Sequence, residues 1–433
     1  MNPFYIPRNR YNSRPGIRVY PTQMETQSLG RLRVRCVTAG EIPIPNASIT
    51  ITPPNQPTQV LEEITTDASG LSPEVELATP PFDYSQQPSE PQPFANYDVR
   101  VTAPNFENMV YNGVEVFPDV TAEQNSVLVP SEQTPEGTAV FNIDANTLYG
   151  IYPPKIPESE IKPVNETGEI VLNRVVVPEY VIVHDGVPSS TAQNYYVRFR
   201  DYIKNVASSE IYSTWPENTI YANVLAILSF TLNRVYTEWY RNQGYNFTIT
   251  SSTAFDHKWT RGRNIFENIS QIVDSVFVNY VSRPGVRQPL LTQYCDGARV
   301  QCPQWLSQWG SKTLGDQGRT AIQILRNYYG NDVFINTATE VAGVPSSWPG
   351  ANLSIGSSGD NVRVIQQQLN RIAQVYTAIP TLVVDGQYGP RTANAVRAFQ
   401  KIFSLPVTGV VDRATWYKIS QIFVAISRLA ELN

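Results

Sequence analysis

Proline is distributed very unevenly along this chain. Of its 34 prolines, 24 lie before residue 180 and 10 lie after it. Because proline has no backbone N–H and its ring clashes with the preceding helical turn, a proline-rich stretch resists helix formation. The first 180 residues are therefore predicted to form strands and loops, and the remainder is free to form helices. The 433 residues suffice for about two or three domains.

Residues 25–130 show the pattern of a small β-sandwich. Short alternating segments are separated by turn sequences such as PNQP and TTDASG, with no helical pattern between them. The order GRLRVRCVTAGEIPIPNASITI, TTDASGLSPEVEL and YDVRVTAPNFE resembles the transthyretin-like, carboxypeptidase-regulatory modules, and this resemblance implies their fold. The expected strands are 32–36, 47–51, 97–101 and 114–117.

Residues 131–178 are rich in proline and acidic residues, and their hydrophobic periodicity is weak. We expect an extended, accessible connector here. Segments of this kind are preferred sites of proteolysis.

Helical periodicity begins at about residue 195. Residues 220–239 are apolar on nearly every side of the expected helix, as is typical of a buried central helix. Over 265–280, apolar residues recur every three or four positions, which also predicts a helix. A third helix is expected over 320–329, with Gly330 as its C-cap. These elements indicate one domain at 179–345 and a small three-helix domain at 350–428.

The last domain carries recurring motifs. The stretches GSSGDNVRVIQQQLN, DGQYGPRTANAVRAFQ and LPVTGVVDRATW resemble the peptidoglycan-binding domain found at the ends of many wall-lytic enzymes. The resemblance implies that peptidoglycan glycan strands are a partner. Gly386 and Gly389 suit a tight turn with positive φ, and Asp385 and Thr392 can hydrogen-bond backbone groups there. These four residues are candidates for wall binding, and each can equally serve only to hold the turn. Two further acids are expected to cap helices, Asp360 and Asp412.

The composition argues against several classes of partner. A formal net charge of −5 gives no electrostatic reason to expect nucleic acid or anionic lipid. No apolar run of about eighteen residues is present, so no membrane span is expected. The N-terminal sequence MNPFYIPRNRYNSRPG lacks the apolar core of a secretory signal. We therefore expect the protein to stay in the compartment of its synthesis, or to be released by an event such as cell lysis.

The sequence contains three cysteines, Cys36, Cys295 and Cys302. An odd, sparse count argues against a disulfide framework, so reduced thiols are the expectation. Two alternatives stay open for CDGARVQC, whose cysteines could staple a hairpin or supply half of a metal site. A zinc site would also need His257 and an aspartate, and nothing in the spacing demands it. No metal or cofactor is therefore expected.

One acid stands apart in the central region. Glu210 lies in NVASSEIYSTWP among small, apolar and aromatic residues, with no Lys or Arg in the next 23 positions. An apolar, cation-free setting raises the pKa of a carboxyl group, which suits a general acid. Lys204 precedes it by six residues and would point elsewhere on a helix. On the residues alone, a surface acid near a helix end is the slightly favoured interpretation, because glutamates are common at helix ends.

Three motifs of the central region occur in order: EIYSTWP at 210–216, LSQWG at 306–310 and ILRNYYG at 324–330. Together they resemble the stage II sporulation protein D (SpoIID) family of lytic transglycosylases. With the β-sandwich before them and the wall-binding domain after them, the chain resembles the SleC type of spore cortex-lytic enzymes. The resemblance implies an α+β catalytic domain in which Glu210 is the catalytic acid and base.

The chemistry of a lytic transglycosylase needs only one carboxyl group. A protonated carboxyl assists the leaving oxygen as the β-1,4 bond between N-acetylmuramic acid and N-acetylglucosamine breaks. The muramic C6 hydroxyl closes on C1 to give a 1,6-anhydro product, and the same carboxylate can take the hydroxyl proton. A second carboxylate is therefore dispensable.

Residues near these motifs are candidates for substrate contacts. Ser307 and Gln308 could hydrogen-bond a glycan, and Trp309 could stack on a sugar ring. Each can also be explained by loop architecture alone. The remaining candidates of this neighbourhood are Trp215, Tyr294 and Asp296.

Asp256 and His257 fall where SpoIID proteins carry a metal-associated Cys/His stretch. This chain lacks that cysteine pattern, which puts the family's zinc site in doubt here. Structural roles are expected for both residues.

The SleC-type resemblance further implies a location in the spore cortex or coat and an inactive precursor. A germination protease would cut between about 150 and 178 and leave a stable fragment beginning near Val175. Three rival functions stay open. They are a non-catalytic wall- or coat-binding adaptor, a glycan hydrolase, and a zinc amidase, which the supply of only two histidines disfavours.

Overall fold

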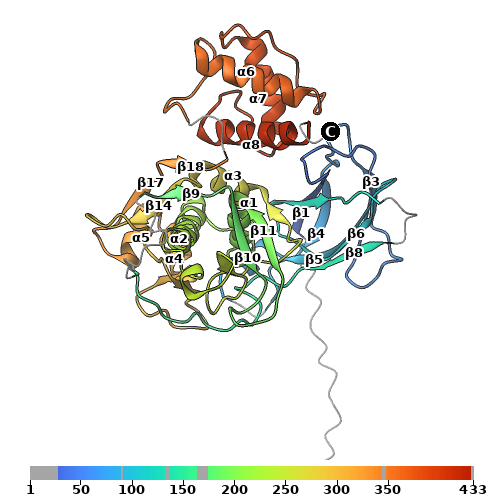
Figure 1. The fold of residues 1–433 in the computed structure, drawn as a ribbon. Coiled ribbons are helices and arrows are strands. Elements are labelled where there is room, and N and C mark those ends of the chain that lie inside the picture. The colour runs from blue at the N-terminus through green and yellow to red at the C-terminus, as the bar shows by residue number, and fades with distance from the viewer. Residues whose placement is uncertain (1–27, 89–90, 132–136, 163–173, 344–347, 431–433) are drawn as a thin grey trace, which may run out of the picture.

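The computed structural model describes residues 28–88, 91–131, 137–162, 174–343 and 348–430. Figure 1 shows three bodies: β-strands from the N-terminal part on one side, a mixed body around α2, and three C-terminal helices lying across both. The chain is thus a multidomain α+β protein. In the described part of the chain, no helix has the length and apolar character needed to cross a membrane.

The N-terminal body consists of two sheets that share a core. One has the order β13-β7-β1-β4 and the other β3-β2-β5-β6-β8. Residues of both sheets, such as Val34 of β1 and Val99 of β5, are completely buried in the same cluster. The strand bounds are β1 (Ser28–Val37), β2 (Ser48–Thr52), β3 (Glu62–Thr65), β4 (Val75–Thr79), β5 (Ala95–Thr102), β6 (Asn108–Val116), β7 (Thr121–Val127) and β8 (Thr138–Asn142), with a short 3-10 helix at Phe82–Ser85.

All four expected strands are present, inside β1, β2, β5 and β6. The alternating pattern did not predict the other four strands of this body, β3, β4, β7 and β8. The strand β7 illustrates a physical reason. Its inward positions include Gln124 and Ser126, which are completely buried although polar. Tyr111 satisfies Ser126 by donating a hydrogen bond of 3.0 Å to its hydroxyl. The likeness to transthyretin-like modules stays a prediction.

Residues 137–162, the largest described part of the expected connector, include many exposed residues, as expected, but the segment also packs against other parts of the chain. β8 pairs in parallel with β6, so residues 138–142 belong to the N-terminal sheet. Further along, Asn146 is completely buried, and Glu158 pairs with the buried Arg234 at 2.6 Å. Three described acidic residues of this segment, Asp144, Glu158 and Glu160, are ion-pair partners. Residues 163–173, where a proteolytic cut is also expected, lie outside the described residues, as do residues 1–27.

The central body is built around one helix. α2 (Glu217–Tyr236) starts after Pro216, and most of its residues are buried on every side. It packs against α1 (Phe199–Glu210), α3 (Glu267–Val276), α4 (Gln308–Asp316) and α5 (Ala321–Tyr329). Figure 1 shows it in the middle of the central body, between α5 and α1. The third expected helix is confirmed as α5, with a Thr320–Gln323 capping box and Gly330 as C-cap.

The helix expected over 265–280 is shorter than its pattern. Ile265 and Phe266 form β13, which pairs with β7, and Asn279–Ser282 form β14. Strand residues that are buried on both faces are apolar without interruption. The residues of β13 and β14 therefore continued the apolar spacing of α3 at both of its ends, and the predicted helix was too long. The other strands of this body are β9 (Val176–Val177), β10 (Tyr180–His184), β11 (Asn194–Arg198), β12 (Ile249–Thr250), β15 (Tyr294–Cys295), β16 (Leu306–Ser307), β17 (Phe334–Thr337) and β18 (Glu340–Val341), and a short 3-10 helix spans Arg241–Gln243.

The C-terminal body consists of α6 (Asp360–Ala373), α7 (Pro390–Ile402) and α8 (Arg413–Ala430), as expected of a three-helix unit. Two equivalent turns follow α6 and α7. Gln366 Oε1 accepts the N–H of Gly386 at 2.9 Å, and Gln400 Oε1 accepts the N–H of Gly409 at 2.8 Å. Both glycines have positive φ, 74° and 71°. The turns therefore form an internal structural repeat.

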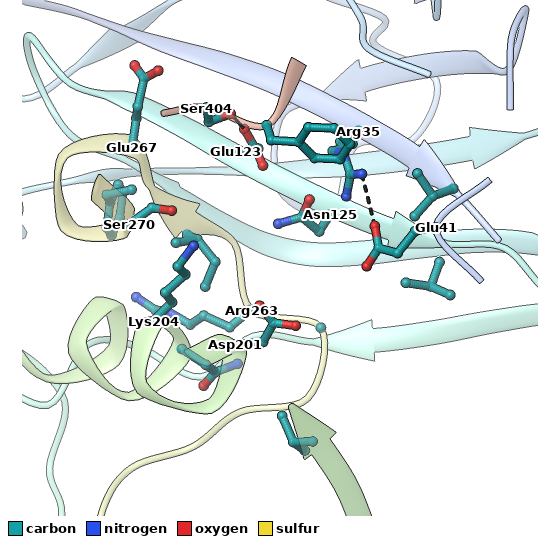
Figure 2. A pocket seen from close by; sticks show the side chains of 18 of the residues that line it. Arg35, Glu41, Glu123, Asn125, Asp201, Lys204, Arg263, Glu267, Ser270 and Ser404 are labelled. Atoms are coloured by element: carbon teal, nitrogen blue, oxygen red, sulfur yellow. Dashed lines mark hydrogen bonds and ion pairs between the residues drawn. The ribbon is translucent and has the colours of Figure 1, made fainter. Parts of the chain in front are cut away.

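The three bodies meet around a cavity of about 310 Å³. Figure 2 shows Arg35 and Glu41 from the N-terminal body, joined at 2.9 Å, with Lys204 and Arg263 of the central body and Ser404 of the C-terminal body. Ser404 donates a hydrogen bond of 2.5 Å to Glu123, which also pairs with Arg33. Several charges that line this cavity thus have partners, and the bond from Ser404 to Glu123 joins two bodies.

Candidate active site

Glu210 is the last residue of α1 and is 3% exposed. The helix stops because Ile211 adopts an extended conformation, which leaves carbonyl groups without helical partners. Side chains satisfy them: Gln308 donates to the Glu210 carbonyl at 2.9 Å, and Asn146 donates to the carbonyls of Ser208 and Ile211 at 3.3 and 3.2 Å. The position of Glu210 is therefore fixed from several elements.

The Glu210 carboxyl group has two hydrogen-bond donors. The Tyr294 hydroxyl donates to Oε2, and the backbone N–H of Lys258 donates to Oε1 at 2.6 Å. Burial raises the pKa of this carboxyl above its usual value, while the nearby Lys155 and the two donors oppose the rise without cancelling it. The group therefore holds its proton to a higher pH than an exposed glutamate, as a general acid requires.

A cavity of about 260 Å³ opens beside this carboxyl group. Four of the predicted site residues line it: Glu210, Tyr294, Asp296 and Gln308. They come from α1, from the start of α4 and from β15 with the loop that follows it. The other lining residues include Thr147, Tyr152, Lys155, Thr253 and Arg299.

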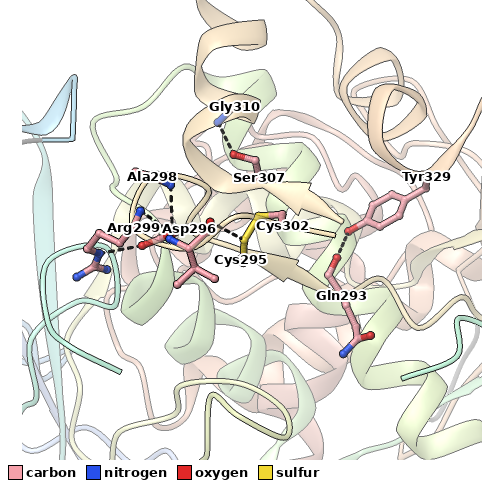
Figure 3. Close-up of a disulfide and its surroundings, with 10 residues drawn as sticks. Gln293, Cys295, Asp296, Ala298, Arg299, Cys302, Ser307, Gly310 and Tyr329 are labelled. Atoms are coloured by element: carbon pink, nitrogen blue, oxygen red, sulfur yellow. Dashed lines mark hydrogen bonds and ion pairs between the residues drawn. A yellow bond between two sulfur atoms is a disulfide. The ribbon is translucent and has the colours of Figure 1, made fainter. Parts of the chain in front are cut away.

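The expectation of reduced thiols is wrong for two of the three cysteines. Cys295 and Cys302 form a disulfide that closes the loop between them, with Cα atoms 5.7 Å apart (Figure 3). The pair staples a hairpin, one of the alternatives left open, and it is not available to a metal. Cys36 is a buried free cysteine.

Asp296 supports this loop from inside. Its Oδ1 accepts the N–H groups of Ala298, Arg299 and Val300 at 3.2, 3.2 and 2.9 Å, and its Oδ2 pairs with Arg299 at 2.8 Å (Figure 3). Arg299 in turn donates to backbone carbonyls of residues 147, 149 and 150. Asp296 thus lines the cavity, but its carboxylate is engaged.

Three other candidates for substrate contacts make contacts within the protein instead: Trp215, Trp309 and Ser307. Trp215 and Trp309 are 3% and 8% exposed and pack edge to face at 4.9 Å, so neither ring offers a face to a sugar. Trp215 also donates to the Ser85 carbonyl of the N-terminal body at 2.9 Å. Ser307 is the N-cap of α4 and accepts the N–H of Gly310 at 2.9 Å. The expectation of a stacking platform at Trp309 does not fit this packing.

Asp256 and His257 have the structural contacts that the sequence indicated. Asp256 is completely buried and accepts from Arg234, Tyr240 and Thr250. His257 is also buried, and burial holds its pKa well below the usual value. No group of three or more potential metal ligands occurs among the residues described.

The expectation of a cation-free setting needs correction. Lys204 does point away, to Asp274 at 2.7 Å. Lys155, however, lines the same cavity as Glu210 and comes from the presumed connector, 55 positions earlier in the sequence. Its neighbours Pro153 and Pro154 indicate only an extended chain. The sequence therefore gave no signal that Lys155 lies at the cavity beside Glu210.

The candidates of the C-terminal body hold a turn. Gly386 has positive φ as expected, but Gly389 has a φ of −94° and needs no glycine conformation. Asp385 accepts from Gln366 and from the N–H of Gln387 at 2.9 and 2.8 Å, and Thr392 is 2% exposed.

The two capping expectations have different outcomes. Asp412 accepts the N–H of Thr415 at 2.8 Å, at the start of α8. Asp360 makes no such bond, because Gly359 occupies the N-cap of α6.

Comparison with known proteins identifies one domain. Residues 358–419 match a family described as "Putative peptidoglycan binding domain". The chain carries a C-terminal peptidoglycan-binding domain. The zinc D-Ala-D-Ala carboxypeptidase of Streptomyces albus G is 41% identical over 76 residues, which are 18% of this chain and 28% of that relative. The chain therefore matches only about a quarter of the relative's length.

The crystal structure of a SleB N-terminal domain is also similar to part of this chain, with 30% sequence identity. The match covers 18% of this chain and 99% of the SleB domain. The TM-score of 0.16 is too low to support a conclusion about the fold.

Proposed function

We propose that this protein is a peptidoglycan lytic transglycosylase in which Glu210 is the acid and the base. The observation that carries the proposal is one buried carboxyl group at a cavity, a group that forms no ion pair in the described part of the chain. Of the two carboxyl groups among the described lining residues, Asp296 is bound to Arg299 and three N–H groups, whereas Glu210 is buried with a raised pKa. This arrangement suits a reaction in which one carboxyl group acts first as the acid and then as the base.

The steps follow from the surroundings of Glu210. The protonated carboxyl gives its proton to the glycosidic oxygen of N-acetylglucosamine as the bond to muramic C1 breaks. The carboxylate that results is stabilised by the Tyr294 hydroxyl and the Lys258 N–H. It then takes the proton of the muramic C6 hydroxyl while O6 bonds to C1. The products are a 1,6-anhydromuramic end and a free 4-hydroxyl, and the acid is regenerated.

The peptidoglycan-binding domain supports the choice of substrate. A wall-binding domain in the same chain as the acid raises the local concentration of the glycan strand for the reacting carboxyl. We propose spore cortex peptidoglycan as the substrate, germination as the occasion, and an inactive precursor activated by a protease. These three parts rest on the resemblance of the sequence motifs.

Product chemistry tests the proposal. Cortex peptidoglycan is incubated with the protein, before and after limited proteolysis, and soluble products are identified by mass spectrometry. The test variant is Glu210→Gln. The matched control is Glu217→Gln, which makes the same change at an exposed position in the first turn of α2.

We expect anhydro-muropeptides from the parent and the control and none from Glu210→Gln. Reducing muramic ends would indicate a hydrolase, and free stem peptides would indicate an amidase. Wall binding without soluble products from any protein would favour the adaptor and contradict the proposal.

A further inference from the structure

Lys155 is the cation at the candidate active site that the proposed reaction does not yet use. It lines the cavity together with Glu210 and Tyr294. Its ammonium lies 4.9 Å from the centre of the Tyr294 ring and 5.0 Å from that of Phe230, and it donates a hydrogen bond to the Asp256 carbonyl. Tyr294 is the residue that donates to the Glu210 carboxylate. Lys155 therefore packs directly against a partner of the acid.

The chain after Lys155 is held firmly to the central body. Ile156 donates its N–H to the Ala254 carbonyl at 2.7 Å and accepts from Gln293 at 2.7 Å. Glu158 donates its N–H to Gln293 at 2.9 Å, and its carboxylate takes two bonds from the buried Arg234 at 2.6 and 3.0 Å. Main-chain bonds and a buried ion pair thus hold Lys155 at the cavity.

Other charged and titratable groups around Glu210 have partners of their own. Lys258 pairs with Asp144 at 2.6 Å, and Arg263 pairs with Glu115. In the described part of the chain, Lys155 has no carboxylate within salt-bridge distance. Four remaining groups face this region from the packed elements. They are Tyr152, hydrogen-bonded to Ala145; Tyr202, hydrogen-bonded to His257; Asp256, paired with Arg234; and Asp296, paired with Arg299.

We infer that Lys155 is a positioning residue for the reaction, which holds Glu210 in its ionised form between the two proton transfers. The inference rests on the proposed function. When the carboxyl has given its proton to the leaving oxygen, the ammonium, which has no carboxylate partner among the described residues, stabilises the buried carboxylate until it takes the C6 hydroxyl proton. The stretch 155–158, which holds Lys155 in place, is accordingly part of the site and not a spacer.

The electrostatics agree with the geometry. Among the influences that oppose burial, Lys155 has the largest effect in lowering the pKa of Glu210. Removing its charge therefore raises that pKa further. An acid that must be protonated in the free enzyme then stays active to higher pH, so the falling alkaline limb of kcat/KM moves upward. A shift on the order of one pH unit is expected for the loss of a nearby opposite charge.

The experiment compares Lys155→Met, Lys155→Arg and the parent. The titration of the Glu210 carboxyl is followed by ¹³C NMR in protein labelled at the glutamate side-chain carboxyls, with the resonance assigned by its loss in Glu210→Gln. The pH profile of kcat/KM on peptidoglycan is measured in parallel. Lys162→Met serves as the control for loosening the segment, since Lys162 pairs with Glu158 on the same stretch.

We expect Lys155→Met to raise both the titration pH of Glu210 and the alkaline limb, with a lower kcat, and Lys155→Arg and Lys162→Met to leave both near the parent values. Equal titration pH values in the parent and Lys155→Met would overturn the inference even if activity fell. A parent protein that releases no anhydro products at any pH, before or after limited proteolysis, would overturn the proposed function, and the NMR shift would separate that result from a failure of the electrostatic coupling.

Discussion

Glu210 and Asp296 line the same cavity, yet their surroundings give the two carboxyl groups different chemistry. Asp296 accepts three N–H bonds and pairs with Arg299, so it stiffens the loop closed by Cys295 and Cys302. Glu210 is buried between α1 and the aromatic Tyr294, where burial raises its pKa. Environment, more than residue type, separates the structural acid from the candidate catalytic acid.

The state of the cysteines gives a prediction at this scale. Alkylation in denaturant should modify one thiol per chain without reductant and three with it, as read by intact-protein mass. Closing an eight-residue loop should stabilise the fold by about 2.5 kcal/mol, so Cys302→Ser should lower Tm. Three modified thiols without reductant would show that Cys295 and Cys302 are not bonded.

At the scale of elements, the residues predicted the long, strongly periodic helices and the alternating strands. They did not predict β7, in which inward-facing residues are polar although they are buried. They also made the predicted helix over 265–280 too long, because the strand residues from Ile265 and Asn279 onward continue its apolar spacing. The candidate site was predicted as far as residues close to the motifs, such as Glu210 and Gln308. Lys155 was missed because a tertiary contact brings it from 55 positions away, and local sequence carries no signal for such a contact.

The contact between β6 and the loop before β13 gives a second prediction. Glu115 and Arg263 form an ion pair that is 1% and 0% exposed, and Arg263 also donates to the Ser208 carbonyl on α1 at 2.9 Å. Glu115→Ala should cost about 3–5 kcal/mol in unfolding free energy, because it leaves a buried charge unpaired. Denaturant unfolding measures the loss.

Glu340→Ala is the matched control for this variant, since it breaks the exposed pair with Arg174. It should cost less than about 1 kcal/mol. Equal losses from the two variants would contradict the role given to the buried pair.

At the scale of the whole molecule, the N-terminal body is joined to the rest by more than the chain. β13 extends its sheet, Trp215 bonds to Ser85, and Glu123 reaches Ser404 of the C-terminal body. Segment 152–162 adds the pairs Glu158–Arg234 and Glu160–Arg283. A cut in the expected processing region therefore breaks the chain without breaking these contacts.

This arrangement predicts the outcome of limited proteolysis. A cut between about 163 and 175 should give two bands on a denaturing gel, the second beginning near Val175. Native mass spectrometry should still show one species with the mass of the uncut chain. Separation of the two pieces under native conditions would mean that the N-terminal body is a detachable region and that Lys155 leaves the site with it.

The role of Glu210 is tested most directly by the rate at which the protease-treated parent and the protease-treated Glu210→Gln variant release 1,6-anhydro-muropeptides from cortex peptidoglycan. We predict a fall of about 10²–10⁴-fold in Glu210→Gln, with wall binding unchanged. Equal rates of release from the two proteins would contradict the assignment of Glu210 as the acid and base.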